Sequence, residues 1–170
     1  MIAMHPFRPA DEKEARLWDV AATVPDPEIP VISIADLGIL RKVAFDADTP
    51  IVTITPTYSG CPAMGHIAAD IVAAVKEAGY PTPVINTVLE PAWTTDWMTP
   101  EGKAQLEEYG IAPPQERPQK QGIVTLSLAI KCPRCGSFNT HKLSHFGSTS
   151  CKALYSCKDC LEPFDYFKVH

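Results

Sequence analysis

The sequence predicts an α+β protein in which a small α/β domain precedes a β domain of the zinc-ribbon type. Helical and strand patterns alternate in the order αββαβα over residues 10–110. Five of the six cysteines lie after residue 130, and four of them form two CxxC pairs. A proline-rich stretch separates the two regions. We therefore expect domains at 1–110 and 123–170, joined by a linker at 111–122.

One helix and two strands are expected in the first part of the chain. Apolar residues recur at helical spacing over 10–24. The next six residues, PDPEIP (25–30), contain three prolines and cannot continue the helix. Strands are expected at 37–46 and 49–58, and the second alternates apolar residues with threonine, as a half-buried strand does.

A helix, a strand and a shorter helix complete the predicted domain. The apolar residues of 62–80 form one helical stripe, and a glycine near the end provides a stop signal. The strand is expected at 83–91. Thr99 followed by Pro100 has the pattern of an N-cap and a first helical residue, which predicts a short helix at 101–110.

Charge and hydropathy exclude several classes of function. Residues 1–130 hold 9 Lys/Arg and 17 Asp/Glu, a balance of −8, which disfavours nucleic-acid binding. Residues 131–170 hold 6 Lys/Arg and 3 Asp/Glu, a balance of +3, so that region is only a weak candidate for nucleic-acid binding. No apolar run approaches the roughly 20 residues that span a bilayer, and the first residues lack a signal-peptide pattern. We expect a cytoplasmic protein that binds neither membrane nor nucleic acid, and in that compartment clustered cysteines indicate metal or reactive thiols.

The two CxxC pairs predict a structural metal site. Cys132 and Cys135 form the first pair, and Cys157 and Cys160 form the second, after 21 intervening residues. Each pair places two thiolates on one tight turn, and four sulfurs suit a tetrahedral zinc ion. A unit of about 40 residues needs such an ion to fold, and structural zinc contributes on the order of 10–16 kcal/mol in small units.

Other interpretations of this region stay open. A rubredoxin-like iron or a redox dithiol would use the same cysteine spacing. His141, His145 or Cys151 would each be able to replace one of the four sulfurs, although Cys151 is expected to be a buried, packed side chain. The aromatic residues are expected to form the core rather than to stack on bases: Phe138, Phe146, Tyr155, Phe164, Tyr166 and Phe167.

The remaining cysteine stands alone in TPTYSGCPA (55–63), between a predicted strand and a predicted helix. Gly60 permits the turn, and Pro62 is typical of a first helical position. A thiol at a helix N-terminus has its pKa lowered from about 8.5 toward 7, because the helix dipole and free N–H groups favour the thiolate. Cys61 is therefore predicted to be a nucleophilic or metal-binding sulfur, and the alternative is a buried packing cysteine.

Three carboxylates are further candidates. Asp36 stands in SIADLGI between short apolar runs, either as a functional acid or as a turn cap. Asp26 and Glu28 have the same ambiguity. His66 would be the base in a cysteine-protease interpretation, but it lies well inside the helix and is expected to be a surface or packing residue. The sequence lacks phosphate-loop, dinucleotide-binding, nucleophile-elbow and di-iron helix motifs, so an independent enzyme is not expected.

The segments DPEIPVISIADLGIL and VTITPTYSGCPA, followed by a helix, resemble the SufT-like family of iron–sulfur cluster assembly proteins. The matching motifs are Asp26-Pro27-Glu28, Asp36-Leu37-Gly38 and the turn from Thr57 to Pro62, within residues 12–95. With PAWTTDWMTPEGKAQLEEYGIAPP and the CxxC unit added, the whole chain is similar to the PaaD family, whose members are subunits of the bacterial phenylacetyl-CoA epoxidase, or phenylacetate-CoA oxygenase. The resemblance implies a SufT-like iron–sulfur assembly domain at 1–110.

This resemblance implies an accessory protein of a ring-epoxidising multicomponent oxygenase, and not an enzyme in its own right. Such a system has a di-iron oxygenase subunit and a reductase with a flavin and an iron–sulfur cluster. These subunits and iron–sulfur assembly proteins are the implied partners, and a PaaD protein would assist assembly or maintenance of a metal centre. Cys61 would hold iron or a cluster transiently, aided by Asp36, and two copies of Cys61 in a homodimer would share one cluster.

A second hypothesis is a non-catalytic adaptor that binds the oxygenase complex through the WTTDWM loop and the zinc unit. Trp93 and Trp97 would anchor that interface, because tryptophan is frequent at interface hot spots. Simple burial of both tryptophans in the core is the alternative.

Overall fold

The structure is a computed structural model that describes residues 5–115 and 129–170. The chain divides into two compact units, residues 1–102 and residues 103–170. Helices and strands before residue 110 follow the predicted order αββαβα, with one short 3-10 helix added, and β-strands make up the remainder. The predicted α+β class is thus confirmed. In the described ranges no helix combines the length and apolar character that crossing a membrane requires.

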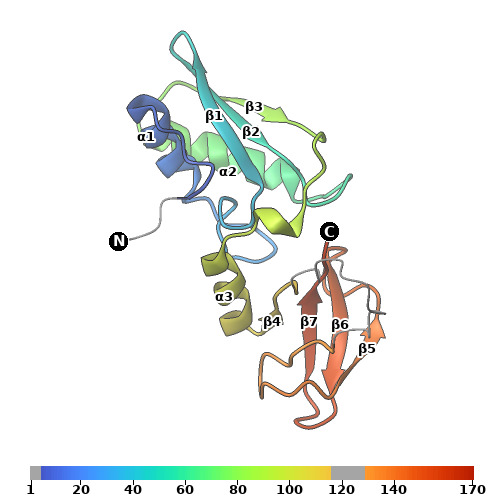
Figure 1. The fold of residues 1–170 in the computed structure, drawn as a ribbon. Helices are drawn as coiled ribbons and strands as arrows, with labels where there is room; N and C mark the ends of the chain where they lie inside the picture. The colour runs from blue at the N-terminus through green and yellow to red at the C-terminus, as the bar shows by residue number, and fades with distance from the viewer. Residues whose placement is uncertain (1–4, 116–128) are drawn as a thin grey trace, which may run out of the picture. The chain divides into compact units, whose positions relative to one another are not determined.

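The first unit is built on a three-stranded sheet with the strand order β1-β2-β3 (Figure 1). β1 and β2 form an antiparallel hairpin, and β3 runs parallel to β2 after the crossover helix α2. The elements up to residue 109 are α1 (Glu12–Ala21), β1 (Leu40–Asp46), β2 (Thr49–Ile54), α2 (Met64–Glu77), β3 (Val84–Thr87), η1 (Thr95–Trp97) and α3 (Pro100–Tyr109).

The helices α1 and α2 bury the apolar faces that the sequence predicts. The Asp11 carboxylate caps α1 by accepting a hydrogen bond from the Glu14 N–H at 3.0 Å. This helix packs against β1 and α2. α2 buries Ile67, Ile71 and Val75, and burying each such side chain contributes roughly 1.5–3 kcal/mol. Packing of this face, more than helix propensity, holds α2 on the sheet.

Several predicted element boundaries shift by a few residues, and two of them shift because the chain turns there. The strand expected at 37–46 begins at Leu40, because Gly38 lies in a turn with a φ of 79°. The helix expected at 62–80 begins at Met64, and its N-cap residue, Ala63, makes no side-chain cap hydrogen bond. The residues just before Ala63 therefore belong to the turn and not to the first helical turn.

The turn that contains Asp36 is tied to the segment around Thr99. The Asp36 carboxylate accepts hydrogen bonds from the hydroxyls of Ser33 at 2.8 Å and Thr99 at 2.7 Å. The Asp36 carbonyl accepts another from the Thr99 N–H at 2.9 Å. A Cβ added at Gly102 would lie 3.0 Å from the Asp36 Cβ, so this side of the turn has no spare room. Asp36 thus links segments that are 63 residues apart.

Gly38 brings the same turn against Trp97. A Cβ at Gly38 would lie 2.7 Å from the Trp97 Cβ and 2.9 Å from the Trp97 carbonyl oxygen. The Arg41 guanidinium lies 3.4 Å from the centroid of a Trp97 ring and 4.1 Å from that of Phe7. Close backbone approach and cation–π stacking therefore fix Trp97 on the turn.

The second unit contains a four-stranded sheet with the order β4-β7-β6-β5 (Figure 1). β5, β6 and β7 are antiparallel neighbours, and β4 pairs in parallel with β7. Of the stretch predicted as a linker, residues 116–122 lie outside the described residues, as does the expected domain start at 123. The predicted domain limits stay a prediction. The strands are β4 (Ile111–Ala112), β5 (Thr140–Ser144), β6 (Lys152–Cys157) and β7 (Pro163–Phe167).

Only part of the predicted aromatic core is buried in this unit. Phe164, Tyr166 and Phe167 are buried, as are three of the cysteines. Phe138 and Phe146 are each 60% exposed, so the prediction that they belong to the core is wrong. They flank β5, which is an edge strand, and a single small sheet cannot cover side chains beyond its edge.

We predict that Gly38→Ala destabilises the first unit by about 2–4 kcal/mol, because the new Cβ overlaps Trp97 and the positive φ adds strain. The matched control is Gly60→Ala, since Gly60 also has a positive φ, 86°, but a Cβ there meets no atom within 4 Å. The Gly60→Ala variant should lose only about 1–2 kcal/mol of its free energy of unfolding. Urea unfolding followed by tryptophan fluorescence measures both values, and equal losses would contradict the importance of the Trp97 contact.

Candidate functional site

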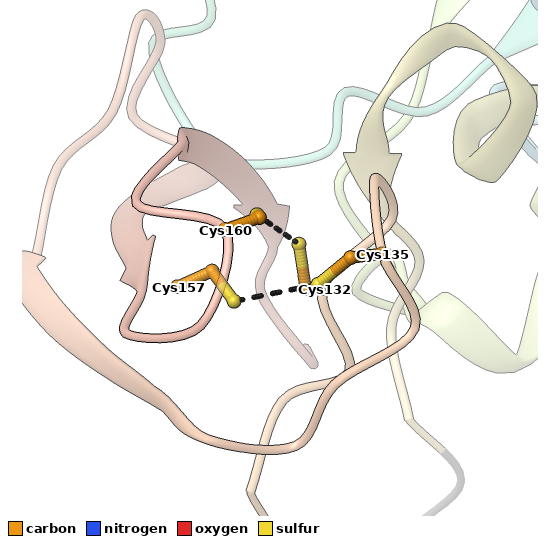
Figure 2. Close-up of side chains that lie close together, drawn as sticks. All are labelled: Cys132, Cys135, Cys157 and Cys160. Atoms are coloured by element: carbon orange, nitrogen blue, oxygen red, sulfur yellow. Dashed lines mark hydrogen bonds between the residues drawn. The ribbon is translucent and has the colours of Figure 1, made fainter.

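The four CxxC cysteines converge on one point (Figure 2). Their sulfurs all lie within 4.8 Å of one another, with Cys132 Sγ 3.8 Å from Cys160 Sγ and Cys135 Sγ 3.5 Å from Cys157 Sγ. A tetrahedral zinc ion with Zn–S bonds of about 2.3 Å separates its sulfurs by about 3.8 Å. The geometry therefore fits one four-coordinate ion. Among residues 5–115 and 129–170 it is the one group of three or more such ligands.

Backbone N–H groups complete the surroundings of these sulfurs. The N–H of Cys160 donates to the sulfur of Cys157 and, as the largest cause, lowers the pKa of Cys157 to about 7. The N–H groups of Ser137 and Glu162 donate to the sulfurs of Cys135 and Cys160 and lower their pKa values, but burial and the neighbouring cysteine sulfurs outweigh this effect and raise both, that of Cys160 to about 12. Such hydrogen bonds stabilise negative charge on sulfur, which a metal ligand needs.

Cys151 and the two nearby histidines do not belong to this group. Cys151 is buried, and its sulfur lies 2.9 Å from the Thr149 hydroxyl oxygen. The prediction that it is a buried side chain is confirmed. His141 and His145 are exposed.

Cys61 lies in the turn between β2 and α2 and is partly buried. Its pKa is raised above the usual value, so the predicted lowering is wrong. Burial of the thiol is the largest cause, and the negative charges of Glu28 and Asp26 add to it. Hydrogen bonds with the Ala63 backbone and the Tyr58 side chain lower the pKa without overcoming these effects.

The prediction for Cys61 failed first because the thiol is partly buried, and then for two further reasons. Because α2 begins at Met64, the thiol does not lie in the first helical turn, where several free N–H groups would face it. The two acids come from the distant segment PDPEIP, so their effect depends on tertiary structure. Cys61 is thus a protonated thiol at neutral pH in an acidic environment.

The acidic segment beside Cys61 follows α1. Asp26 is only 5% exposed, and its Oδ1 accepts hydrogen bonds from the N–H groups of Glu28 and Ile29, both at 2.8 Å. The turn-cap interpretation is therefore confirmed for Asp26. Its charge nevertheless acts on the thiol. Hydrophobic periodicity does not indicate that these acids act on Cys61. The only indication in the sequence is that the acids and Cys61 belong to motifs of the same family.

Asp36 has a different environment from the one predicted for a partner of Cys61. It is not among the groups that act on the Cys61 pKa, and both its carboxylate oxygens accept hydroxyl hydrogen bonds. His66 is exposed on α2. In the structure the charges of Glu28 and Asp26 therefore act on Cys61, whereas Asp36 is connected to the loop that carries the tryptophans.

The two tryptophans of that loop differ. Trp93 is buried, and its indole N–H donates to the Leu37 carbonyl at 3.1 Å. Trp97 is only partly buried. Of the two alternatives for the tryptophans, simple burial in the core therefore applies to Trp93. Trp97 retains accessible surface that an interface would be able to use.

Two protein families match separate parts of the chain. Residues 14–84 match the family described as iron-sulfur cluster assembly protein, and this range contains Cys61, Asp26 and Asp36. Residues 116–168 match the PaaD zinc beta ribbon domain, which contains the four CxxC cysteines. The zinc-ribbon expectation for the second region is thus confirmed.

Comparisons with individual proteins extend these matches. The crystal structure of a domain of unknown function, DUF59, from Bacillus anthracis has a TM-score of 0.51 and 28% identity, covering 55% of this chain and 90% of that chain. An Escherichia coli (strain K12) protein named as a subunit of 1,2-phenylacetyl-CoA epoxidase is 47% identical over 152 residues, which are 89% of this chain and 90% of that protein. Because this identity extends over most of both proteins and the zinc ribbon is of the PaaD type, the chain belongs to the PaaD family of phenylacetyl-CoA epoxidase subunits.

Proposed function

We propose that this chain is an accessory protein of a phenylacetyl-CoA ring-epoxidising multicomponent oxygenase, and that it assists assembly or maintenance of an iron–sulfur or di-iron centre. The observation that carries the proposal is a partly buried Cys61, on which the charges of Glu28 and Asp26 act, in a domain that matches iron–sulfur cluster assembly proteins. The name of the Escherichia coli relative supports the link to the oxygenase. In this proposal the oxidation itself belongs to other subunits.

The surroundings of Cys61 suit transient holding of an iron cargo. A thiol with a raised pKa keeps its proton at neutral pH, so a metal ion or cluster must displace that proton to bind the sulfur. The carboxylates that disfavour a bare thiolate attract cationic iron, and their oxygens are ligands for hard cations. Binding is then coupled to proton release and is weaker than at a site with four thiolates.

Asp36 contributes to this function indirectly. Its hydrogen bonds to Ser33 and Thr99 fix the turn that follows the acidic segment and leads into β1. A homodimer, in which two Cys61 sulfurs share one cluster, is part of the proposal, as are contacts with the oxygenase and reductase subunits and with iron–sulfur assembly proteins.

The four-cysteine group has a separate role as the holder of structural zinc. Four thiolates close the coordination of a tetrahedral ion, which leaves no position for an exchanging ligand. We therefore assign zinc to Cys132, Cys135, Cys157 and Cys160, and iron or a cluster to Cys61 as cargo.

A non-catalytic adaptor is the second candidate function. Trp97 supports it, because its accessible surface lies in the WTTDWM loop. Trp93 gives no such support, since it is buried. An adaptor would depend on this loop and on the zinc unit, but not on Cys61.

The purified chain should contain about one zinc ion, and removing it should unfold the second unit. Structural zinc contributes on the order of 10–16 kcal/mol, which is as much as the whole stability of a small domain. Hydrogen exchange after EDTA treatment should show protection lost from β5, β6 and β7 but kept in β1 and β2. Cys61→Ser, with unchanged zinc content, is the control. Protection that persists in β6 without metal would contradict a structural role.

Alkylation of Cys61 by iodoacetamide should be slow at pH 7 and should rise about tenfold per pH unit up to at least pH 8.5, because less than about 3% of the thiol is ionised at neutral pH. Glu28→Gln should increase the rate at pH 7 about two- to fivefold by removing a negative charge. Mass spectrometry of the peptide that contains Cys61 measures the rate in the zinc-loaded chain. Asp70→Asn, an exposed change on α2, is the control. A rate that levels off below pH 8 would show a lowered pKa instead.

The proposed function predicts that Cys61→Ser abolishes metal-centre maturation in cells. In a phenylacetate-degrading strain whose own copy of this gene is deleted, the variant should lower epoxidase activity at least about tenfold, with iron deficient in the purified oxygenase or reductase. Ser59→Ala, in the same exposed turn, should complement fully.

Trp97→Ala in the same strain distinguishes the two candidate functions. Full activity with Cys61→Ser together with loss of activity in Trp97→Ala would favour the adaptor. Full iron loading in the Cys61→Ser strain would exclude the proposed maturation role.

A further inference from the structure

The first unit contains a cavity of about 630 Å³ that involves none of the residues acting on Cys61. It lies between the N-terminal arm, the Asp36 turn and the start of α3. Phe7, Trp97 and Met98 give it an apolar lining, and three carboxylates also line it: Asp36, Asp96 and Glu101. Its volume is in the range of about 300–1,000 Å³ that is usual for ligand sites.

The aromatic part of this cavity is held by contacts that do not depend on a ligand. Phe7 and Trp97 meet edge to face, with ring centroids 6.5 Å apart, and the Arg41 guanidinium lies against both rings. His5 anchors the arm, because the Phe7 N–H donates to its Nδ1 at 3.1 Å and its Nε2 donates to the Ala35 carbonyl at 3.0 Å. The cavity is therefore formed before any partner binds.

The charge of the lining is negative. Asp96 and Glu101 are exposed, and within the described ranges neither carboxylate has an ion pair or a side-chain hydrogen bond. Burial lowers the pKa of His5, so that ring is neutral at pH 7, and Arg41, the cation that packs on the Phe7 and Trp97 rings, is outnumbered by the three carboxylates. Residues 1–102 hold 6 Lys/Arg and 14 Asp/Glu, a balance of −8, so the net charge of the first unit has the same negative sign as the cavity lining.

We infer that this cavity receives a lysine- or arginine-bearing segment of a partner protein. The aliphatic stem of such a side chain packs on aromatic rings while its charged head stays at the wet rim. Here the stem would lie on Phe7, Trp97 and Met98, and the head between Asp96 and Glu101. This interaction surface is separate from the Cys61 site, so the inference does not depend on iron handling.

The test uses the zinc-loaded full chain, labelled with ¹⁵N and titrated with acetyl-Leu-Lys-Leu-Lys-Leu-amide. The Trp97 indole N–H and the Glu101 amide signals should shift, and binding should weaken about tenfold when both lysines of the peptide are replaced by glutamine. The double variant Asp96→Asn/Glu101→Gln should bind the lysine peptide about five- to tenfold more weakly. The matched control, Asp70→Asn/Glu90→Gln, removes the same charge from exposed positions outside the cavity and should change binding less than about twofold.

Each other outcome would overturn the inference. Equal binding of the glutamine peptide would show an apolar groove without preference for cations. Equal losses in the two double variants would show attraction by net charge alone. Binding that appears only when residues 1–4 are deleted would show that the chain's own N-terminal residues occupy the cavity. Signals that do not move at millimolar peptide would exclude a site for basic segments.

Discussion

The Asp36 carboxylate, hydrogen-bonded by two hydroxyl groups, is the contact on which the arrangement of the first unit depends. It joins the turn before β1 to the segment that starts α3, and hydrogen bonds to a charged group are worth roughly 1.5–3 kcal/mol each. The approach is so close that Gly38 and Gly102 both lie where a Cβ would collide. Without this link, Trp97 and Thr99 would lose their fixed position on the turn.

The chain places its sulfurs in two different environments. At the four-cysteine group, four sulfurs lie close enough to share one ion, and backbone N–H groups that donate to Cys157 lower its pKa to about 7. At Cys61, burial and the negative charges of Glu28 and Asp26 favour the protonated thiol of a single sulfur. Four converging sulfurs suit an ion that stays bound and one protonated thiol suits a cargo that exchanges, so the division supports separate roles for zinc and for a transient cargo.

Sequence patterns predicted what depends on local spacing. The Ile67, Ile71 and Val75 stripe indicated α2, because it follows from helical spacing, and the two CxxC pairs indicated a four-sulfur site, because each pair places two sulfurs on one turn and a tetrahedral ion needs two such pairs. The sign of the Cys61 pKa shift could not be predicted, since it depends on burial, on acids from a distant turn and on a helix start shifted to Met64. Trp93 and Trp97 could not be distinguished either, because the loop has no period that assigns a face.

If Cys61 holds cargo as proposed, burial and the nearby acids also account for the stability of its thiol in the empty protein. The reactive form toward oxidants is the thiolate, and at this site that form adds one more negative charge beside two carboxylates. Burial and charge therefore suppress it in the empty protein. In the proposed function, bound iron would reverse this balance, because its positive charge would compensate the carboxylates and the sulfur together. In the proposed function the thiolate thus exists mainly while cargo covers it, which protects the sulfur between transfers and makes its release sensitive to protons.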